Sequence, residues 1–382
     1  MNFIDLAGQQ RRISEKLQAN IAAVLAHGQY IHGPEIRELE KILAAYVGVK
    51  HAVGCASGTD ALLMALMALD IGPGDAVFTT PFTFIATAEV ISLLGATPVF
   101  VDIDPATFNI DPVKLDRAAE AVEKNDPARH PLPDTAGGKL RPRAVIPVDL
   151  FGLPADYAAL GAVAARRNLL IIEDAAQSFG GEYKGRKACS FGRIACTSFF
   201  PAKPLGCYGD GGMCFTEDDR LAEGLRSIRN HGQGSDKYEN IRIGINGRLD
   251  TLQAAILLAK FSIFPEEIEL RQEVARRYNA LLGGRVTTPG IPKDYRSAWA
   301  QYSILVRDGA ERSDLMAKLR EAGIPTAIYY PKPLHRQTAF AGLGYREGDF
   351  PVSDECAARI FSLPMHPYLT AEDQRRIAAL FA

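Results

Sequence analysis

The sequence predicts an α/β protein with a mostly parallel sheet flanked by helices, plus a small C-terminal α+β domain. Short apolar runs of strand character alternate with helical patterns, which is typical of parallel strands buried between two helical layers. The six runs lie at residues 76–80, 97–102, 144–150, 169–172, 195–200 and 212–216. We expect a large domain over residues 1–250, and a linking helix with the small domain over residues 251–382.

The two ends of the chain complete this plan. Apolar residues recur every four positions over 9–26, which predicts a docked helix, and Gly33-Pro34 introduces a second helix over 35–46. Residues 250–282 have a helical pattern that is interrupted at Pro265. The patterns beyond them predict, in order, a strand at 299–306, a helix at 313–322, a strand at 326–330 and two closing helices.

Composition excludes several classes of protein. The 382 residues carry a formal net charge of −2, with 47% hydrophobic and 23% charged residues, which are ordinary globular values. No basic block points to nucleic acid or a membrane surface, and no apolar run is long enough to span a membrane. No HExxH motif or paired His/Cys cluster indicates a metal. Six cysteines without CxxC spacing predict free thiols in a reducing compartment, and we expect the cytoplasm.

Lys203 is the first candidate site residue. Pro201 and Pro204 place it on a stiff loop after an apolar run, and we expect Phe199 and Phe200 to shelter it. A partly desolvated lysine has a lowered pKa and becomes a nucleophile able to form a Schiff base. Glycines at 209, 211 and 212 predict a sharp turn or a close approach of the backbone to a neighbour. The alternative is a solvated loop lysine.

Asp174 is the second candidate. It follows the apolar run 169–172, so we expect it at the carboxyl end of a buried parallel strand, where open α/β sheets bind ligands. A carboxylate at this point can keep the ring nitrogen of pyridoxal phosphate (PLP) protonated. Gln177, three residues later, can lie beside the ring oxygen. Helix capping is the alternative for both residues.

The third candidate is the stretch Ser57-Gly58-Thr59-Asp60, which opens a helical run. Small residues at a helix N-terminus present free N–H groups that bind phosphate, although capping explains the polar residues equally well. Each of the three elements is weak alone. Their order along the chain is more specific: a phosphate site, a strand-end aspartate, and a lysine five residues after the hydroxyl of Ser198.

Together, Gly58-Thr59, Asp174-x-x-Gln177 and Ser198-x4-Lys203 resemble the cofactor site of the DegT/StrS-type sugar aminotransferases, which have the type I aminotransferase fold. The likeness extends to His27-Gly28-Gln29-Tyr30-Ile31, Gly33-Pro34-Glu35, Gly72-Pro73-Gly74-Asp75, Arg229-Asn230-His231-Gly232 and Asn246-Gly247-Arg248-Leu249-Asp250. Within the family the chain is most similar to the enzymes that aminate carbon 3 of UDP-linked 3-keto sugars. It departs from the family at 125–142, a Pro- and Gly-rich insert that we expect to be a surface excursion.

The resemblance implies that PLP is the cofactor and that Lys203 holds it as a Schiff base and moves protons during transfer. It implies that Asp174 pairs with the ring nitrogen, that Gln177 lies near the ring oxygen, and that Phe84 stacks on the ring. Contacts to the phosphate are expected from Gly58, Thr59, Ser198 and, across a homodimer with shared active sites, Asn246 of the other subunit. The substrate side is expected to include Arg229, Arg248, Tyr329, Tyr330 and His335.

The reaction implied is transfer of an amino group from L-glutamate to a keto carbon of a nucleotide-linked sugar, in amino-sugar or surface-polysaccharide biosynthesis. Amination at carbon 4, or of a dTDP-linked 6-deoxy sugar, is the nearest alternative. A PLP-dependent sugar dehydratase is another, but that branch replaces the lysine by histidine. A non-catalytic regulator that binds PLP or nucleotide sugar is a third.

Three single residues keep alternatives of their own. Phe84 can equally be a core residue, His335 can be structural, and Asn246-Gly247 can be a simple turn. Relatives acting on a 3-keto uronate carry a histidine where this chain has Tyr329, which argues against a carboxylate-bearing sugar.

Overall fold

A seven-stranded sheet forms the centre of the computed structural model, which describes residues 1–135, 138–236 and 238–381. The strands are ordered β1-β9-β8-β5-β4-β2-β3. All neighbouring pairs are parallel except those made by β9, which runs antiparallel to β1 and β8. The strands of this sheet are β1 (His51–Cys55), β2 (Asp75–Thr79), β3 (Thr97–Phe100), β4 (Arg141–Ile146), β5 (Leu170–Asp174), β8 (Ile194–Ser198) and β9 (Gly212–Thr216).

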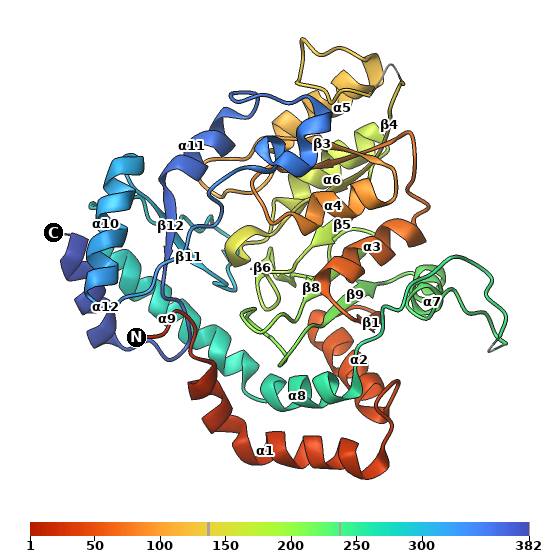
Figure 1. Ribbon diagram of the computed structural model, residues 1–382, viewed down its shortest axis with the longest axis horizontal. Helices are drawn as coiled ribbons and strands as arrows, with labels where there is room; N and C mark the ends of the chain where they lie inside the picture. The colour runs from red at the N-terminus through yellow and green to blue at the C-terminus, as the bar shows by residue number, and fades with distance from the viewer. Residues whose placement is uncertain (136–137, 237, 382) are drawn as a thin grey trace.

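Helices cover both faces of the sheet (Figure 1). One face packs on α3, α4 and α7, while the other packs on α5 and α6 at one end and on α2 and α8 at the other. Side chains alternate accordingly, since Val77 faces the first layer and Phe78 the second. The helices of these layers are α2 (Pro34–Val47), α3 (Gly58–Ala68), α4 (Ala86–Leu93), α5 (Pro112–Lys124), α6 (Tyr157–Arg167), α7 (Asp219–Ile228) and α8 (Thr251–Phe261).

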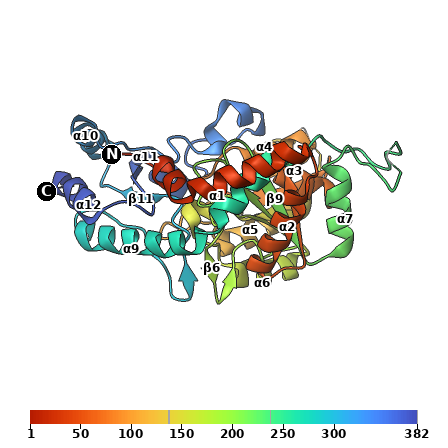
Figure 2. The same ribbon diagram turned by 90° about the horizontal axis from the view of Figure 1, so that it is seen from below.

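The C-terminal part builds a second module around the two-stranded sheet of β11 (Tyr302–Leu305) and β12 (Ile360–Leu363). Its helices are α9 (Phe264–Leu282), α10 (Gly309–Glu321), α11 (Pro351–Arg359) and α12 (Ala371–Ala378). Both chain ends lie beside this module (Figures 1 and 2), and the carbonyl of Phe3 accepts a hydrogen bond from the amide of Met365. No helix of the described residues is long and apolar enough to cross a membrane.

Shorter elements complete the chain. A three-stranded sheet in the order β10-β6-β7 joins the two modules. Its strands are β6 (Glu182–Tyr183), β7 (Arg186–Lys187) and β10 (Tyr295–Arg296), and the 3₁₀ turns are η1 (Leu150–Gly152), η2 (Leu334–Arg336), η3 (Thr338–Leu343) and η4 (Ala379–Phe381).

The packing of α8 bears on the division of the chain. The long first helix, α1 (Leu6–His27), lies along α8, and α2 also packs against it. The core of the C-terminal module, in contrast, draws on α9 only from Val274 onward. We therefore propose that the division falls within α9 rather than at residue 250.

The structure differs from the predicted elements in several places, and β12 is among the strands that were not predicted. Strand β1 was not predicted because its sequence is short and contains a histidine and Gly54, neither of which favours strands. The expected strand at 326–330 is wrong. That segment makes one isolated bridge, between Ala327 and Ser362, on the side of β12 that does not pair with β11. Residues 136–137 of the insert at 125–142 lie outside the described residues. The part before them is anchored rather than purely superficial, since buried His130 binds the carbonyl oxygen of Phe100 through Nε2 at 2.7 Å.

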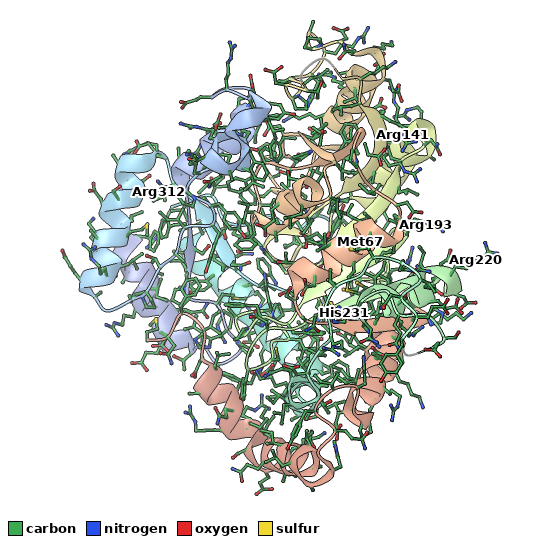
Figure 3. All side chains as sticks on the ribbon, turned by 45° about the vertical axis from the view of Figure 1, so that its right-hand side comes forward. Met67, Arg141, Arg193, Arg220, His231 and Arg312 are labelled. Atoms are coloured by element: carbon green, nitrogen blue, oxygen red, sulfur yellow. The ribbon has the colours of Figure 1, made fainter. Side chains whose placement is uncertain are left out.

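The segment between α7 and α8 projects from the body of the protein (Figures 1 and 2). It begins next to His231, which is labelled in Figure 3, and it exposes Ile241 and Ile243 to solvent. In the same view the exposed Arg220 of α7 marks the outer edge of this side of the molecule. The segment returns to the body through Gly247, whose carbonyl accepts a hydrogen bond from the amide of Ala56 at 3.0 Å.

Candidate active site

Asp174 ends β5 and is buried, as the sequence predicts for a residue at the carboxyl end of a parallel strand. Its Oδ2 accepts a hydrogen bond from the hydroxyl of Thr87 at 2.7 Å, and its Oδ1 accepts one from the amide of Ala176 at 3.2 Å. Burial raises the pKa of the carboxyl group, while these hydrogen bonds and the charge of Lys203 lower it. A cation beside this buried carboxyl group would stabilise its ionised form.

Lys203 follows β8 on a turn in which its amide donates to the carbonyl of Phe200 at 2.8 Å. Phe199 is fully buried beneath the turn, as expected, but Phe200 is half-exposed and does not shelter the lysine as predicted. Burial lowers the pKa of the Lys203 amine to about 8, and the nearby Asp174 opposes this shift. A substantial neutral fraction near neutral pH makes the amine a nucleophile.

The N-terminus of α3 lies against the end of β8. A Cβ placed on Gly58 would lie 2.7 Å from the Cβ of Ser198, so only glycine permits this approach. A Cβ on Gly212 would lie 2.3 Å from the carbonyl oxygen of Ser57. The close approach predicted for the glycines after Lys203 is thus present at Gly212. Together the half-buried Gly58 and Thr59 and the Ser198 hydroxyl form a small cup of N–H and O–H donors.

Gln177 does not cap a helix. Its Oε1 accepts from the amide of Phe151 at 2.7 Å, and its Nε2 donates to the hydroxyl of Tyr330 at 3.2 Å. The side chain therefore joins the turn after β4 to the segment that carries Tyr329 and Tyr330. These two tyrosines thus reach the same edge of the sheet as Asp174, although they come from the C-terminal part of the chain.

The aromatic residues at 82 and 84 have opposite environments. Phe82 is fully buried, whereas Phe84 is 55% exposed, which excludes the core interpretation of Phe84. The carbonyl of Phe84 accepts from the amide of Thr87, the residue that binds Asp174. Thr87 was not predicted. Its sequence signal is a single hydroxyl in an otherwise apolar helical stretch. Its hydrogen-bond partner lies 87 residues further along the chain, so no local pattern links the two residues.

Asn246 and Arg248 lie where the projecting segment returns to the body of the protein, and each makes an isolated β-bridge. Oδ1 of the exposed Asn246 accepts from Nε and Nη2 of Arg248 at 3.0 and 2.7 Å. These two donors orient the amide so that its NH₂ group faces away from Arg248. Because Gly247 binds Ala56, the pair also lies close to the cup at Gly58.

Two residues expected on the substrate side have other roles. Nη1 of Arg229 binds Oε1 of Glu40 at 2.6 Å and the carbonyl oxygen of Gly54 at 2.8 Å, so this buried guanidinium ties β1 to α2. The side chain of His335 is completely buried against the Phe350 ring, with Nε2 3.4 Å from Oδ1 of Asp354. A side chain without exposed surface cannot contact a substrate, so the structural alternative holds for His335.

The chain's own residues fit PLP. Asp174 is a buried carboxylate suited to a protonated ring nitrogen, and Lys203 supplies an amine of lowered pKa beside it. The cup at Gly58 and Ser198 suits a phosphate, and the exposed Phe84 ring provides a stacking surface. Within the described residues no group of His, Cys, Asp and Glu is arranged to hold a metal ion. All six cysteines are free and buried, as expected.

A lysine of lowered pKa, a buried strand-end carboxylate and a cup of donors at a helix N-terminus together suit a PLP-dependent enzyme. Comparison with known proteins gives the family. Residues 11–382 match the model of the DegT/DnrJ/EryC1/StrS aminotransferase family. The chain belongs to this family, and it is a PLP-dependent transaminase.

Two curated relatives are similar over nearly the whole chain. A UDP-2-acetamido-2-deoxy-3-oxo-D-glucuronate aminotransferase of Pseudomonas aeruginosa is 49% identical, with 99% of each chain covered. A UDP-N-acetyl-3-dehydro-α-D-glucosamine 3-aminotransferase of Acidithiobacillus ferrooxidans is 39% identical and covers 99% of this chain and 96% of its own.

Solved structures confirm the type I aminotransferase fold. A DegT/DnrJ/EryC1/StrS aminotransferase from Brucella abortus has a TM-score of 0.94 and 51% identity, over 100% of this chain and 98% of its own. The structure of NtdA from Bacillus subtilis, solved with its bound cofactor PMP, has a TM-score of 0.84 and 29% identity, over 97% and 81% of the two chains.

Proposed function

We propose that this enzyme transfers the amino group of L-glutamate to the C3 keto carbon of a UDP-linked sugar, in the biosynthesis of an amino sugar for surface polysaccharide. The observation that carries the proposal is the joint presence of the Lys203–Asp174 pair and two full-length relatives whose names both specify a UDP-linked 3-keto sugar. The nearest alternative, a dTDP-linked or C4-keto sugar, changes the acceptor but not the cofactor side of the site.

The residues have the following roles in this proposal. PLP, when bound, acts as the electron sink that makes the α-proton of an amino acid removable. Asp174 would keep the ring nitrogen protonated, and the hydrogen bonds from Thr87 and the Ala176 amide hold Asp174 in place and lower its pKa. The Lys203 amine would attach the cofactor and would take and return the proton at the reacting carbon. Gly58, Thr59 and Ser198 hold the phosphate, and Phe84 stacks on the ring.

The test separates donor from acceptor. PLP-loaded protein is mixed with L-glutamate alone, and release of 2-oxoglutarate in a single turnover is measured. The washed, aminated enzyme is then offered UDP-linked 3-keto N-acetylglucosamine, the matching uronate, and a dTDP-linked 4-keto-6-deoxy sugar. We expect amino-sugar product with at least one UDP-linked 3-keto sugar, and the first two acceptors differ only at carbon 6. Product from the dTDP sugar alone would overturn the C3 assignment.

We further infer a homodimer in which Asn246 completes the phosphate site of the partner. The projecting segment exposes Ile241 and Ile243, and Tyr30 and Ile31 are exposed apolar residues near its return. A second copy of the chain would cover such side chains and supply each contact twice. The Asn246 NH₂ group is oriented as a free donor by Arg248, which suits a phosphate oxygen.

The six buried thiols support a reducing compartment, and we infer that the enzyme works in the cytoplasm.

A further inference from the structure

Two carboxyl groups, those of Asp149 and Glu173, meet in the fully buried region behind the candidate site. Asp149 lies between β4 and η1, and Glu173 precedes Asp174 in β5. The two carboxyl groups lie close enough for each to shift the pKa of the other. Neither belongs to the cofactor or substrate contacts described above, because the side chains of neighbouring strand residues point to opposite faces of a sheet.

Every oxygen of the pair also accepts a hydrogen bond from a neighbour. Asp149 Oδ1 accepts from the Tyr157 hydroxyl at 2.7 Å and from the Ala155 amide at 2.9 Å, and Oδ2 accepts from the Ser178 hydroxyl at 2.7 Å. Glu173 Oε1 and Oε2 accept from the backbone amides of residues 189 and 191 at 2.6 and 2.7 Å. The pair is therefore fixed from α6, from the turn after β5 and from the loop before β8.

No cation balances the pair, because no ion pair to either carboxyl group occurs within the described part of the chain. The titratable groups that face it are Tyr157 from α6, Cys189 from the loop before β8, Tyr295 from β10, and Asp174. All of these are neutral or acidic. Two carboxylates in such surroundings cannot both be ionised, and a hydrogen bond between them requires a proton. Burial accordingly raises the pKa of both carboxyl groups, and the charge of Asp149 adds to the rise at Glu173.

The turn that begins at Asp149 supports two of the residues predicted to contact the PLP ring, Asp174 and Gln177. The Asp149 amide donates to the carbonyl of Asp174 at 3.0 Å, and the Phe151 amide donates to Oε1 of Gln177 at 2.7 Å. The same turn reaches the C-terminal module, because the Gly152 carbonyl accepts from the Ala298 amide at 2.8 Å. Phe151 holds a positive φ of 59°, a conformation that a non-glycine residue adopts only when its surroundings fix it.

We propose that Asp149 and Glu173 share one proton, and that the resulting carboxyl–carboxylate hydrogen bond holds the turn 149–152 where it positions Asp174 and Gln177. The proton belongs on Asp149. Both oxygens of Glu173 accept from backbone N–H groups, whose direction is fixed, so neither oxygen can carry a proton without losing a hydrogen bond. The hydroxyls of Tyr157 and Ser178, which bind Asp149, can rotate and accommodate a proton there. Asp149 and Glu173 are thus positioning residues, and this role rests on the proposed ring contacts of Asp174 and Gln177.

The geometry makes an asymmetric prediction for the two amide variants. In Asp149→Asn the amide NH₂ can donate to Glu173 where the shared proton did, so the turn keeps its position without a titrating proton. In Glu173→Gln the NH₂ must face one of two backbone donors, which leaves a buried hydrogen bond broken. We expect Asp149→Asn to keep PLP affinity within about threefold at pH 7, and Glu173→Gln to lose at least about tenfold.

The proton itself is tested by the pH dependence of unfolding, measured on the apoprotein and the holoenzyme between pH 5 and 9. The native pair holds a proton that the unfolded chain releases above about pH 4 to 5. The stabilisation that the bound proton gives the native state is therefore complete below that pH, and it declines as the pH rises toward 7 and above. Asp149→Asn should lower the slope of the free energy of unfolding against pH by the equivalent of about one proton. The control is Asp156→Asn, which changes the half-buried aspartate that caps α6 and should leave this slope unchanged.

The outcomes separate the possible failures. An unchanged pH slope in Asp149→Asn, or equal damage from both amide variants, overturns the shared proton. Asp149→Leu tests the positioning role, because it removes every hydrogen bond of the side chain. If this variant binds PLP normally at a temperature well below its unfolding midpoint, the pair is only structural. Neither measurement uses glutamate or a sugar, so both stand apart from the proposed reaction.

Discussion

Asp174 and Asn246 are both predicted cofactor contacts, but the chain holds them in different ways. Asp174 is buried at a strand end, and Thr87 and the Ala176 amide fix both of its oxygens. Asn246 is exposed on a projecting segment, where Arg248 from the same segment is its hydrogen-bond partner. We therefore propose that one chain supplies the residues that hold the ring, whereas Asn246 donates a hydrogen bond to the phosphate bound by a neighbouring subunit. The following experiments test this difference, starting with the largest effect.

Lys203→Ala should reduce turnover by at least about 10⁴-fold, because it removes both the cofactor attachment and the proton-transfer group. Product formation from glutamate and the keto sugar measures the loss. Lys184→Ala, which changes an exposed lysine, is the matched control and should keep full activity. Near-normal turnover by Lys203→Ala, with an unchanged circular dichroism spectrum, would remove Lys203 from the site.

The pKa of Lys203 gives a separate prediction for the apoprotein. Only the neutral amine attacks the PLP aldehyde, and burial lowers the pKa to about 8. The rate of PLP incorporation should therefore rise about tenfold per pH unit below pH 8 and level off above it. Stopped-flow absorbance of the bound cofactor follows this rate. A rise that continues to pH 10 would mean that the amine is solvated.

Asp174→Asn should bind PLP but lose about 10- to 200-fold in kcat, because a neutral amide no longer stabilises the protonated ring nitrogen. The single-turnover release of 2-oxoglutarate measures this step directly. Wild-type rates would reduce Asp174 to the capping role that its sequence position also allowed.

These two residues show why the ring side of the site could be predicted from sequence. Asp174 ends an apolar run and Lys203 follows one, so local patterns alone put both at the carboxyl ends of parallel strands. Thr87 escaped such reasoning because its contact with Asp174 depends on how distant strands are ordered in the sheet. His335 was misplaced for the same reason, since only tertiary packing shows that Phe350 covers it.

The projecting segment predicts complementation between chains. A Lys203→Ala chain is mixed with an Asn246→Ala, Arg248→Ala chain, each inactive alone. If Asn246 serves the partner, one site of each mixed dimer has both intact groups, and random mixing should restore about a quarter of wild-type activity. Size-exclusion chromatography with differently tagged chains shows whether exchange took place. No recovery after proven exchange would mean that each chain builds its phosphate site alone.

Thr87→Val should lower kcat/KM by about tenfold, because the buried Asp174 carboxylate loses a hydrogen-bond donor. Loss of this donor raises the pKa of Asp174 further, so the acid limb of the pH profile should move to higher pH. Thr216→Val is the matched control, since that buried hydroxyl binds the carbonyl of Arg193 at the opposite end of the sheet. An acid limb that does not move would assign Thr87 to packing alone.

The smallest effect is expected at His335, whose side chain is fully buried. Neither ring nitrogen has a hydrogen-bond partner among the described residues, and burial lowers the pKa, so the ring is neutral at pH 7. His335→Leu, of similar volume, should change the free energy of unfolding by less than about 1.5 kcal/mol and leave KM for the nucleotide sugar within about twofold. Tyr330→Phe, which removes the hydroxyl that accepts from Gln177, should raise KM more. A tenfold rise in KM for His335→Leu with an unchanged melting temperature would show that His335 contacts the substrate. In that case the sequence position of His335 would have located the substrate side of the site correctly.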